Sequence, residues 1–233
     1  MRHEALVEPR AYSPADLLGP LNEVEKKYAP AQLFVHGDIT LLRRTPRVAV
    51  IGSRNASEIG LRRAKKLARF LADRGAVVVS GLAKGIDAAA HRAAIEDAGR
   101  TIGVIGTPLN RAYPKENADL QELIAAKHLL VSQFPIGART GPWSFPVRNR
   151  TMALLANASV IVEAGNSSGS LSQGWETLRL GRPLFFMKGL LDSPGITWPA
   201  EMQRYGAQVL VEPEQLEEFI PEANFAEYAA AGF

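Results

Sequence analysis

Cysteine is absent from the 233-residue chain, and so is any apolar run long enough to cross a bilayer. Without cysteine, neither disulfides nor thiolate metal sites can form, and a reducing compartment is favoured. A membrane-spanning helix needs about 20 consecutive apolar residues, so none is predicted. The first residues hold acids and lack the apolar segment of a signal peptide, which favours a soluble, cytoplasmic protein.

Two common nucleotide-binding motifs are also missing. No Gly-Lys-Ser/Thr follows a four-residue glycine spacing, so ATP hydrolysis by a P-loop is not expected. The interval from Gly52 to Gly60 is longer than a G-x-G-x-x-G fingerprint, so no dinucleotide cofactor is predicted. We therefore expect a binding protein with no cofactor, no metal ion and no catalytic residue.

Charge is distributed unevenly, although the net charge is only +3. Residues 47–200 hold 20 lysines and arginines against 11 acids, whereas residues 201–233 hold one arginine against seven glutamates. A basic centre with an acidic tail suits a body that binds a polyanion. The alternative is that scattered surface charges merely keep the protein soluble.

From residue 47 onward, short β-branched runs alternate with longer helical patterns. Apolar strands that alternate with helices predict a single main α/β domain, a doubly wound, mostly parallel sheet of the extended Rossmann-like type. We divide the chain into an N-terminal lead-in (1–46) that packs on the core, the Rossmann-like domain (47–212), and an acidic C-terminal helix and tail (213–233). Strands are expected at 47–53, 76–81, 101–106, 128–134, 159–164, 183–187 and 207–211, and helices at 59–74, 86–98, 116–126, 148–157, 171–180 and 198–205.

The helix expected at 59–74 carries several basic residues outside its buried stripe. They spread around the helix rather than forming one row, so a solvated face is favoured over a nucleic-acid patch.

Small-residue turns follow three of the expected strands, at 52–54, 80–87 and 163–172. Parallel strands bring these turns to one edge of the sheet, where backbone N–H groups and helix N-termini can face a phosphate. An ordinary helix cap remains the alternative for the third turn. The residues expected to bind phosphate here are Gly52, Ser53, Arg54, Ser80, Gly81, Lys84, Gly85, Ser168, Gly169 and Ser170.

The segment 143–150 gives the strongest indication of nucleic-acid binding. Arg148, Asn149 and Arg150 open an otherwise apolar helix, and each arginine can grip a phosphate. Trp143 and Phe145 offer faces on which unpaired bases could stack, in a way that tolerates any base. The alternative for both rings is that they plug the core beneath the long loop at 135–147.

Asp87 and His91 lie four residues apart on the helix expected at 86–98. They could form a carboxylate–imidazole pair for acid–base chemistry. A structural role is favoured, because no nucleophile or third group is evident.

Five segments together resemble the DNA-processing protein A (DprA/Smf) family. They are VAVIGSR, VVVSGLAKGIDAAAH, the Tyr-Pro of RAYPKEN, SFPVRNR and VIVEAGNSSGSL, in this order and at the family's spacing. The resemblance implies binding of single-stranded DNA during natural transformation, loading of the RecA recombinase, and a homodimer. By motif match, it implies a DNA pocket lined by Arg54, the turn 81–85, Phe145, Arg148, Asn149 and Arg150.

Departures from the family pattern leave other ligands and roles open. Ser172 and Gln173 follow the Ser-Gly-Ser-Leu of the third turn, where the family usually continues with Thr-Ala. The alternative is a nucleotide-sensing or phosphoribohydrolase-like domain of the same superfamily, in which Glu176 would take the position of the catalytic glutamate. A role in defence or general recombination, rather than transformation, also remains open.

Overall fold

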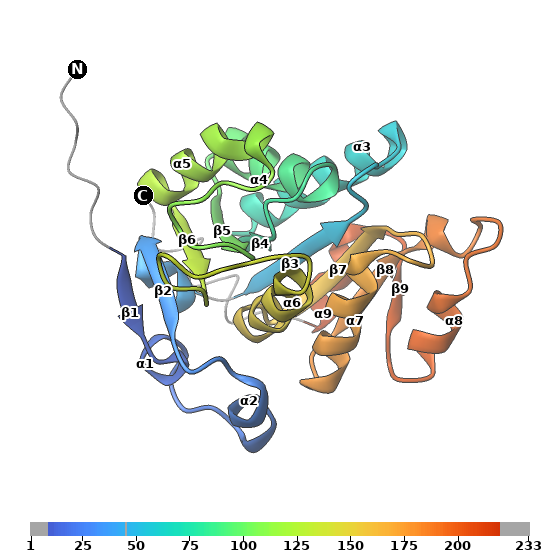
Figure 1. Ribbon diagram of the computed structural model, residues 1–233. Coiled ribbons are helices and arrows are strands. Elements are labelled where there is room, and N and C mark those ends of the chain that lie inside the picture. Colours follow the sequence, from blue (N-terminus) through green and yellow to red (C-terminus); the bar gives the residue numbers. More distant parts are fainter. Residues whose placement is uncertain (1–8, 45, 220–233) are drawn as a thin grey trace.

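Nine strands form one sheet in the computed structural model, which describes residues 9–44 and 46–219 (Figure 1). The order across the sheet is β1-β2-β6-β5-β4-β3-β7-β8-β9. Seven of these strands, β3 to β9, run parallel to one another. They are β3 (Arg47–Gly52), β4 (Val77–Ser80), β5 (Arg100–Ile105), β6 (Leu129–Ser132), β7 (Ala158–Glu163), β8 (Leu184–Met187) and β9 (Gln208–Leu210).

The parallel strands are buried on both faces, as their apolar sequences predict. Alternate residues of β3 serve two separate cores: Val48 and Val50 pack on one side of the sheet, Ala49 and Ile51 on the other. Because successive side chains of a strand point to opposite faces, a continuous apolar run is what a sheet covered by helices on both sides requires. The doubly wound α/β architecture is thus confirmed.

The helices divide between the two faces of the sheet (Figure 1). One layer holds α3 (Glu58–Asp73), α4 (Ile86–Glu96) and α5 (Ala118–Lys127), and α9 (Leu216–Phe219) adds Leu216 to the core beneath α3 and α4. The opposite layer holds α6 (Ser144–Leu155), α7 (Gly169–Arg179) and α8 (Trp198–Gln203). Among the described residues, no helix combines the length and apolar character needed to cross a membrane.

The expected helix at 148–157 was wrong at its start, because α6 begins at Ser144. Pro146 lies in the first turn, where backbone N–H groups have no partner within the helix, so the missing N–H of proline costs nothing. The final residues of the expected loop at 135–147 are therefore helical.

The N-terminal segment extends the sheet on the β6 side. It provides β1 (Arg10–Tyr12) and β2 (Leu33–Gly37), and β2 pairs antiparallel with β6. Between these strands, α1 (Pro14–Leu18) and α2 (Glu23–Tyr28) each begin with a capping box. The division into lead-in, main domain and tail stays a prediction, and residues 220–233 lie outside the described part of the chain.

The basic residues of α3 are largely engaged by acids. Lys66 pairs with Glu212 at 3.0 Å, and Arg74, the residue directly after the helix, pairs with Glu217 at 2.8 Å. Arg69 pairs with acids that end α4. A solvated, ion-paired face is thus observed, and two glutamates of the acidic C-terminal region neutralise part of it.

Candidate phosphate-binding pocket

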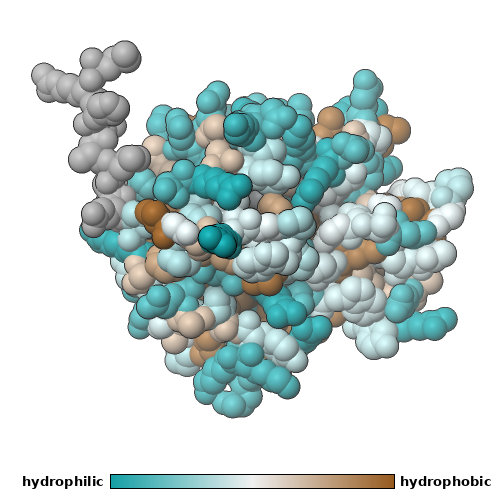
Figure 2. All heavy atoms as spheres, viewed as in Figure 1, coloured by the Kyte–Doolittle hydropathy of each residue, from teal (hydrophilic) through white to brown (hydrophobic). Residues whose placement is uncertain are grey.

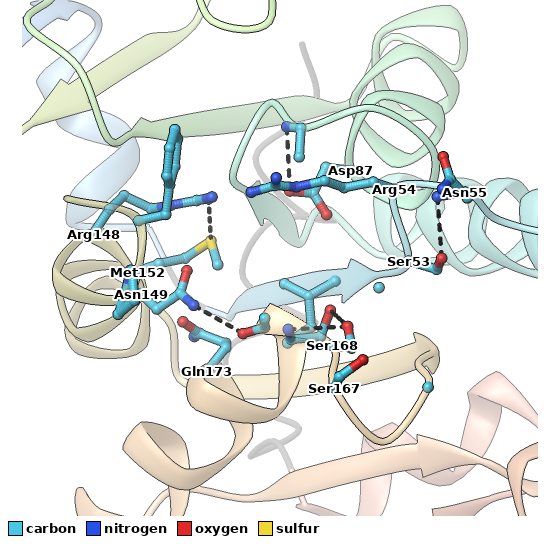
Figure 3. A pocket seen from close by; sticks show the side chains of 18 of the residues that line it. Ser53, Arg54, Asn55, Asp87, Arg148, Asn149, Met152, Ser167, Ser168 and Gln173 are labelled. Carbon is cyan, nitrogen blue, oxygen red and sulfur yellow. Dashed lines mark hydrogen bonds between the residues drawn. The ribbon is translucent and has the colours of Figure 1, made fainter. Parts of the chain in front are cut away.

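A pocket of about 650 Å³ opens at the carboxyl ends of the parallel strands (Figure 3). This edge is where doubly wound proteins hold their ligands. Of the residues expected to bind phosphate or DNA, those that line the pocket are Gly52, Ser53, Arg54, Phe145, Arg148, Asn149, Ser168, Gly169 and Ser170.

The turn after β3 forms one wall. The N–H of Ser53 donates to the carbonyl of Glu163 at 2.7 Å, which ties this turn to the end of β7. Gly52 is needed there, because a Cβ would lie 2.6 Å from the Ile86 side chain. Arg54 follows with an exposed side chain whose guanidinium lies 5.3 Å from the centre of the Phe145 ring.

Arg148 reaches the pocket from α6 and is 5% exposed. Its Nη1 donates to the Val104 carbonyl at 3.3 Å, and its buried Nε has no hydrogen-bond partner within the described structure. Figure 3 shows the side chains of Arg54 and Arg148 extending toward one another. Two cations therefore converge on one pocket, and one of them carries an unused donor.

Asp87 is a buried carboxylate close to this pair. Its Oδ2 accepts hydrogen bonds from the N–H groups of Gly81 and Ala83. Burial raises the pKa of Asp87, and the Arg148 charge opposes that rise. Burial lowers the pKa of Arg148, and Asp87 opposes that fall. The two groups thus compensate one another in a poorly solvated place.

The turn at 80–87 shapes the pocket from behind. The Ser80 hydroxyl donates to the Val50 carbonyl, and Lys84 pairs with Glu116. A Cβ at Gly81 would overlap the Arg148 guanidinium, and one at Gly85, where φ is +74°, would overlap the Ser53 carbonyl. These predicted residues do not line the pocket; the two glycines leave room for Arg148 and for the turn after β3.

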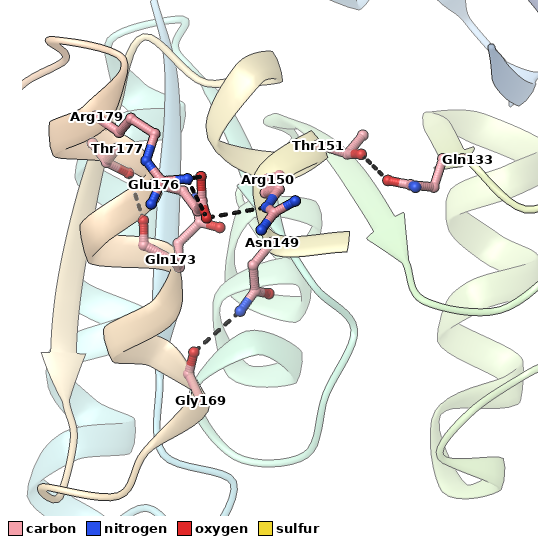
Figure 4. Close-up of polar contacts among 9 residues, drawn as sticks. All are labelled: Gln133, Asn149, Arg150, Thr151, Gly169, Gln173, Glu176, Thr177 and Arg179. Atoms are coloured by element: carbon pink, nitrogen blue, oxygen red, sulfur yellow. Dashed lines mark hydrogen bonds and ion pairs between the residues drawn. The ribbon is translucent and has the colours of Figure 1, made fainter. Parts of the chain in front are cut away.

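Asn149 and Arg150 point in different directions, although they are adjacent (Figure 4). Asn149 lines the pocket and donates to the Gly169 carbonyl at 3.1 Å, which joins α6 to the start of α7. Arg150 instead pairs with Glu176 at 3.2 Å, and Glu176 also pairs with Arg179. Arg150 therefore does not line the pocket with Arg54 and Arg148.

The N-terminus of α7 forms the opposite wall. The Ser168 hydroxyl accepts from the Ser170 N–H at 3.2 Å, so the cap that was the alternative for this turn is present. Ser167, Gly169 and Ser170 line the pocket beside it. A helix N-terminus carries partial positive charge and attracts anions.

Some aromatic residues near the pocket line it, and Trp143 lies outside its wall. Phe145 lines the pocket, and its ring centroid lies 5.2 Å from that of Tyr113. Trp143 is 57% exposed, so the alternative in which it plugs the core is wrong. Sequence reasoning missed Tyr113 as a wall residue, although its Tyr-Pro was part of the family resemblance.

Asp87 and His91 do not form a pair. His91 is buried, and its Nδ1 lies 2.7 Å from the Thr101 hydroxyl of β5. Burial lowers the pKa of His91 to about 3, so the ring is neutral at physiological pH. His91 thus contacts Thr101 of a strand, in place of the bond to Asp87 or to a neighbouring loop that the structural interpretation predicted.

The family model described as DNA recombination-mediator protein A matches residues 10–221. The chain belongs to this family. It is 36% identical to the DNA processing protein DprA of Bacillus subtilis over 84% of this chain and 66% of that protein.

Two solved structures of the family have the same fold. DprA from Streptococcus pneumoniae superposes with a TM-score of 0.79 and 33% identity, covering 93% of this chain and 76% of that one. DprA from Helicobacter pylori, described for its single-stranded DNA binding mode, gives a TM-score of 0.75 and 27% identity, covering 89% and 94%. The chain spans about half to two thirds of the length of its curated DprA and Smf relatives.

Proposed function

We propose that the chain binds single-stranded DNA, with phosphates on the turns that begin at Gly52 and Gly169 and a base against Phe145. In this proposal it acts in DNA uptake, transformation or recombination, protecting the strand and helping to load a RecA-type recombinase. Membership of the recombination-mediator family supports this proposal. A homodimer and a cytoplasmic location belong to the same proposal.

The observation that carries the proposal is that Arg148, a buried and charged side chain, lines the pocket. A buried guanidinium is costly unless each N–H group has a partner, and here Nε has none within the described residues. The only carboxylate among the residues that line the pocket is Asp87, which accepts hydrogen bonds from the backbone. A phosphate in the pocket would place negative charge beside the guanidinium of Arg148, and Arg54 would contact the same or the next phosphate.

A nucleotide-sensing module is the second candidate, because the pocket volume also suits a small molecule. Ligand sites commonly enclose about 300–1,000 Å³, and this pocket measures about 650 Å³. Glycoside-bond hydrolysis has weaker support, since Glu176 is held by Arg150 and Arg179 and does not line the pocket.

Fluorescence anisotropy with mixed-sequence oligonucleotides distinguishes these candidates. We expect comparable binding of different strands, and a tenfold to hundredfold weakening for Arg54→Gln, because a charge-assisted hydrogen bond contributes about 1.5–3 kcal/mol. Arg100→Gln is the matched control: Arg100 is also exposed, but it begins β5 at the opposite edge of the sheet.

Failure to bind any strand at low salt, together with tight binding of a mononucleotide, would favour the sensing module. Release of free base from a nucleoside monophosphate, abolished by Glu176→Gln, would favour the hydrolase. For a homodimer, light scattering should give twice the mass of the chain.

A further inference from the structure

Two loops border the pocket on the side of β5 and β6. Residues 107–115 follow β5, and residues 133–143 follow β6 and cross to α6 (Figure 1). Each loop gives a residue to the pocket wall, Tyr113 from the first and Pro142 from the second. A strand that leaves the pocket on this side would meet both loops at once.

All charged residues in these two loops are basic. Together they contain three basic residues, Arg111, Lys115 and Arg139, and no aspartate or glutamate. All three are exposed, and none forms an ion pair within the described residues. The next residue in the chain, Glu116, follows Lys115 in the short 3-10 helix Lys115–Asn117 and pairs with Lys84. An anionic chain is the partner that this surface fits.

Trp143 ends the second loop, next to Pro142 of the pocket wall, and is 57% exposed. Its ring contacts the buried Phe134 edge to face, with centroids 5.7 Å apart. That contact holds the indole and leaves more than half of the side chain open to solvent. On the face shown in Figure 2, apolar residues lie in small patches among polar ones rather than in one broad surface. This mixture suits bases and phosphates better than an apolar protein partner.

Hydrogen bonds hold the first loop in place before any ligand binds. The Ser132 hydroxyl donates to the Thr107 carbonyl and the Thr107 hydroxyl donates to the Arg111 carbonyl, both at 2.7 Å. Arg111 Nη1 reaches the Thr140 hydroxyl of the second loop at 3.4 Å. A ligand therefore pays little entropy to order this surface.

We propose that a single strand leaving the pocket continues over a second subsite, the aromatic–basic rim, formed by Trp143, Tyr113, Arg111, Lys115 and Arg139. A base stacks on Trp143, and the arginines contact the phosphates beside it. This inference rests on the proposed single-strand binding, and it gives the direction of the strand: across the carboxyl ends of β5 and β6.

The test is the length dependence of the effect of Trp143→Ala. Affinities for a trinucleotide and a 15-mer of thymidine are measured by anisotropy, the trinucleotide by competition. We expect Trp143→Ala to weaken the 15-mer about fivefold to a hundredfold, as loss of one base stack does, and to leave the trinucleotide unchanged. Trp143→Phe keeps a ring and should restore most of the 15-mer affinity.

Tyr205→Ala is the matched control, because Tyr205 is 67% exposed and contacts Trp175 edge to face at 5.3 Å, yet it lies outside both loops. It should change neither affinity. If Trp143→Ala weakened binding of the trinucleotide and of the 15-mer equally, the proposed rim subsite would be wrong. An unchanged affinity for the 15-mer would also contradict it. If the wild-type protein bound no strand at all, the proposed function itself would fail together with the rim.

Discussion

Replacing Gly81 by alanine is expected to disable the pocket without substituting any residue that lines it. A Cβ at Gly81 would overlap the Arg148 guanidinium, whereas the backbone at Gly81 has no left-handed φ and accepts a side chain. The buried arginine must therefore move, and its place beside Asp87 and its hydrogen bond to the Val104 carbonyl are lost.

The expected loss of stability and of affinity follows from the hydrogen bonds that Arg148 would lose. A hydrogen bond to a charged group contributes about 1.5–3 kcal/mol, so Gly81→Ala should lower the free energy of unfolding by about 2 kcal/mol. Displacement of the guanidinium also removes one phosphate contact. The affinity for a single strand should fall about tenfold to a hundredfold, beyond any loss from unfolded protein.

Gly169→Ala is the control for this experiment. Gly169 lines the same pocket and begins α7, but a Cβ there would meet nothing within 4 Å. It should be as stable as the wild type or slightly more so, because alanine favours the helix. Urea denaturation is measured on both variants, and anisotropy on Gly81→Ala, because Gly169 belongs to the proposed phosphate site and its variant controls for stability alone. Wild-type affinity in Gly81→Ala would refute the role given to Arg148.

Two further predictions concern buried polar groups outside the pocket. His91 has a folded-state pKa of about 3, below its ordinary 6.5, so its contribution to stability is present above pH 6.5 and lost as pH falls toward 3. Between pH 7.5 and pH 5, urea denaturation should show that the wild type loses about 2 kcal/mol more than His91→Gln, and equal losses would contradict the shift. Arg182 donates to the carbonyls that end α6 and pairs with Glu25 at 2.6 Å, with both side chains mostly buried. Arg182→Met should lower the free energy of unfolding by about 3–5 kcal/mol, and a loss below 1 kcal/mol would show that the pair contributes little.

The parallel core could be predicted because its strands are short, buried on both faces and close to their helices in sequence. The pairing of β2 with β6 could not, since it joins segments about a hundred residues apart and no local pattern specifies it. Strand β1 is only three residues long and its first two residues are exposed, so it lacks the alternation that marks a strand.

For the candidate pocket, too, the sequence predicted only part of the arrangement. Turns after strands predicted which backbone segments meet at the edge of the sheet, but not which side chains face inward. Arg148 and Arg150 were grouped by sequence, yet residues two apart on a helix point to nearly opposite sides. Helical spacing could have separated them. Ion pairs such as Lys84–Glu116 depend on tertiary contacts, which sequence alone does not reveal.

The salt dependence of binding tests the central claim most directly. If Arg54 and Arg148 hold a run of phosphates, the logarithm of the association constant should fall linearly with the logarithm of salt concentration, by about 0.7 per phosphate contacted. Arg54→Gln should make that slope shallower by about one contact, whereas Arg100→Gln should leave it unchanged. A slope that is the same in the wild type and in Arg54→Gln would contradict the account.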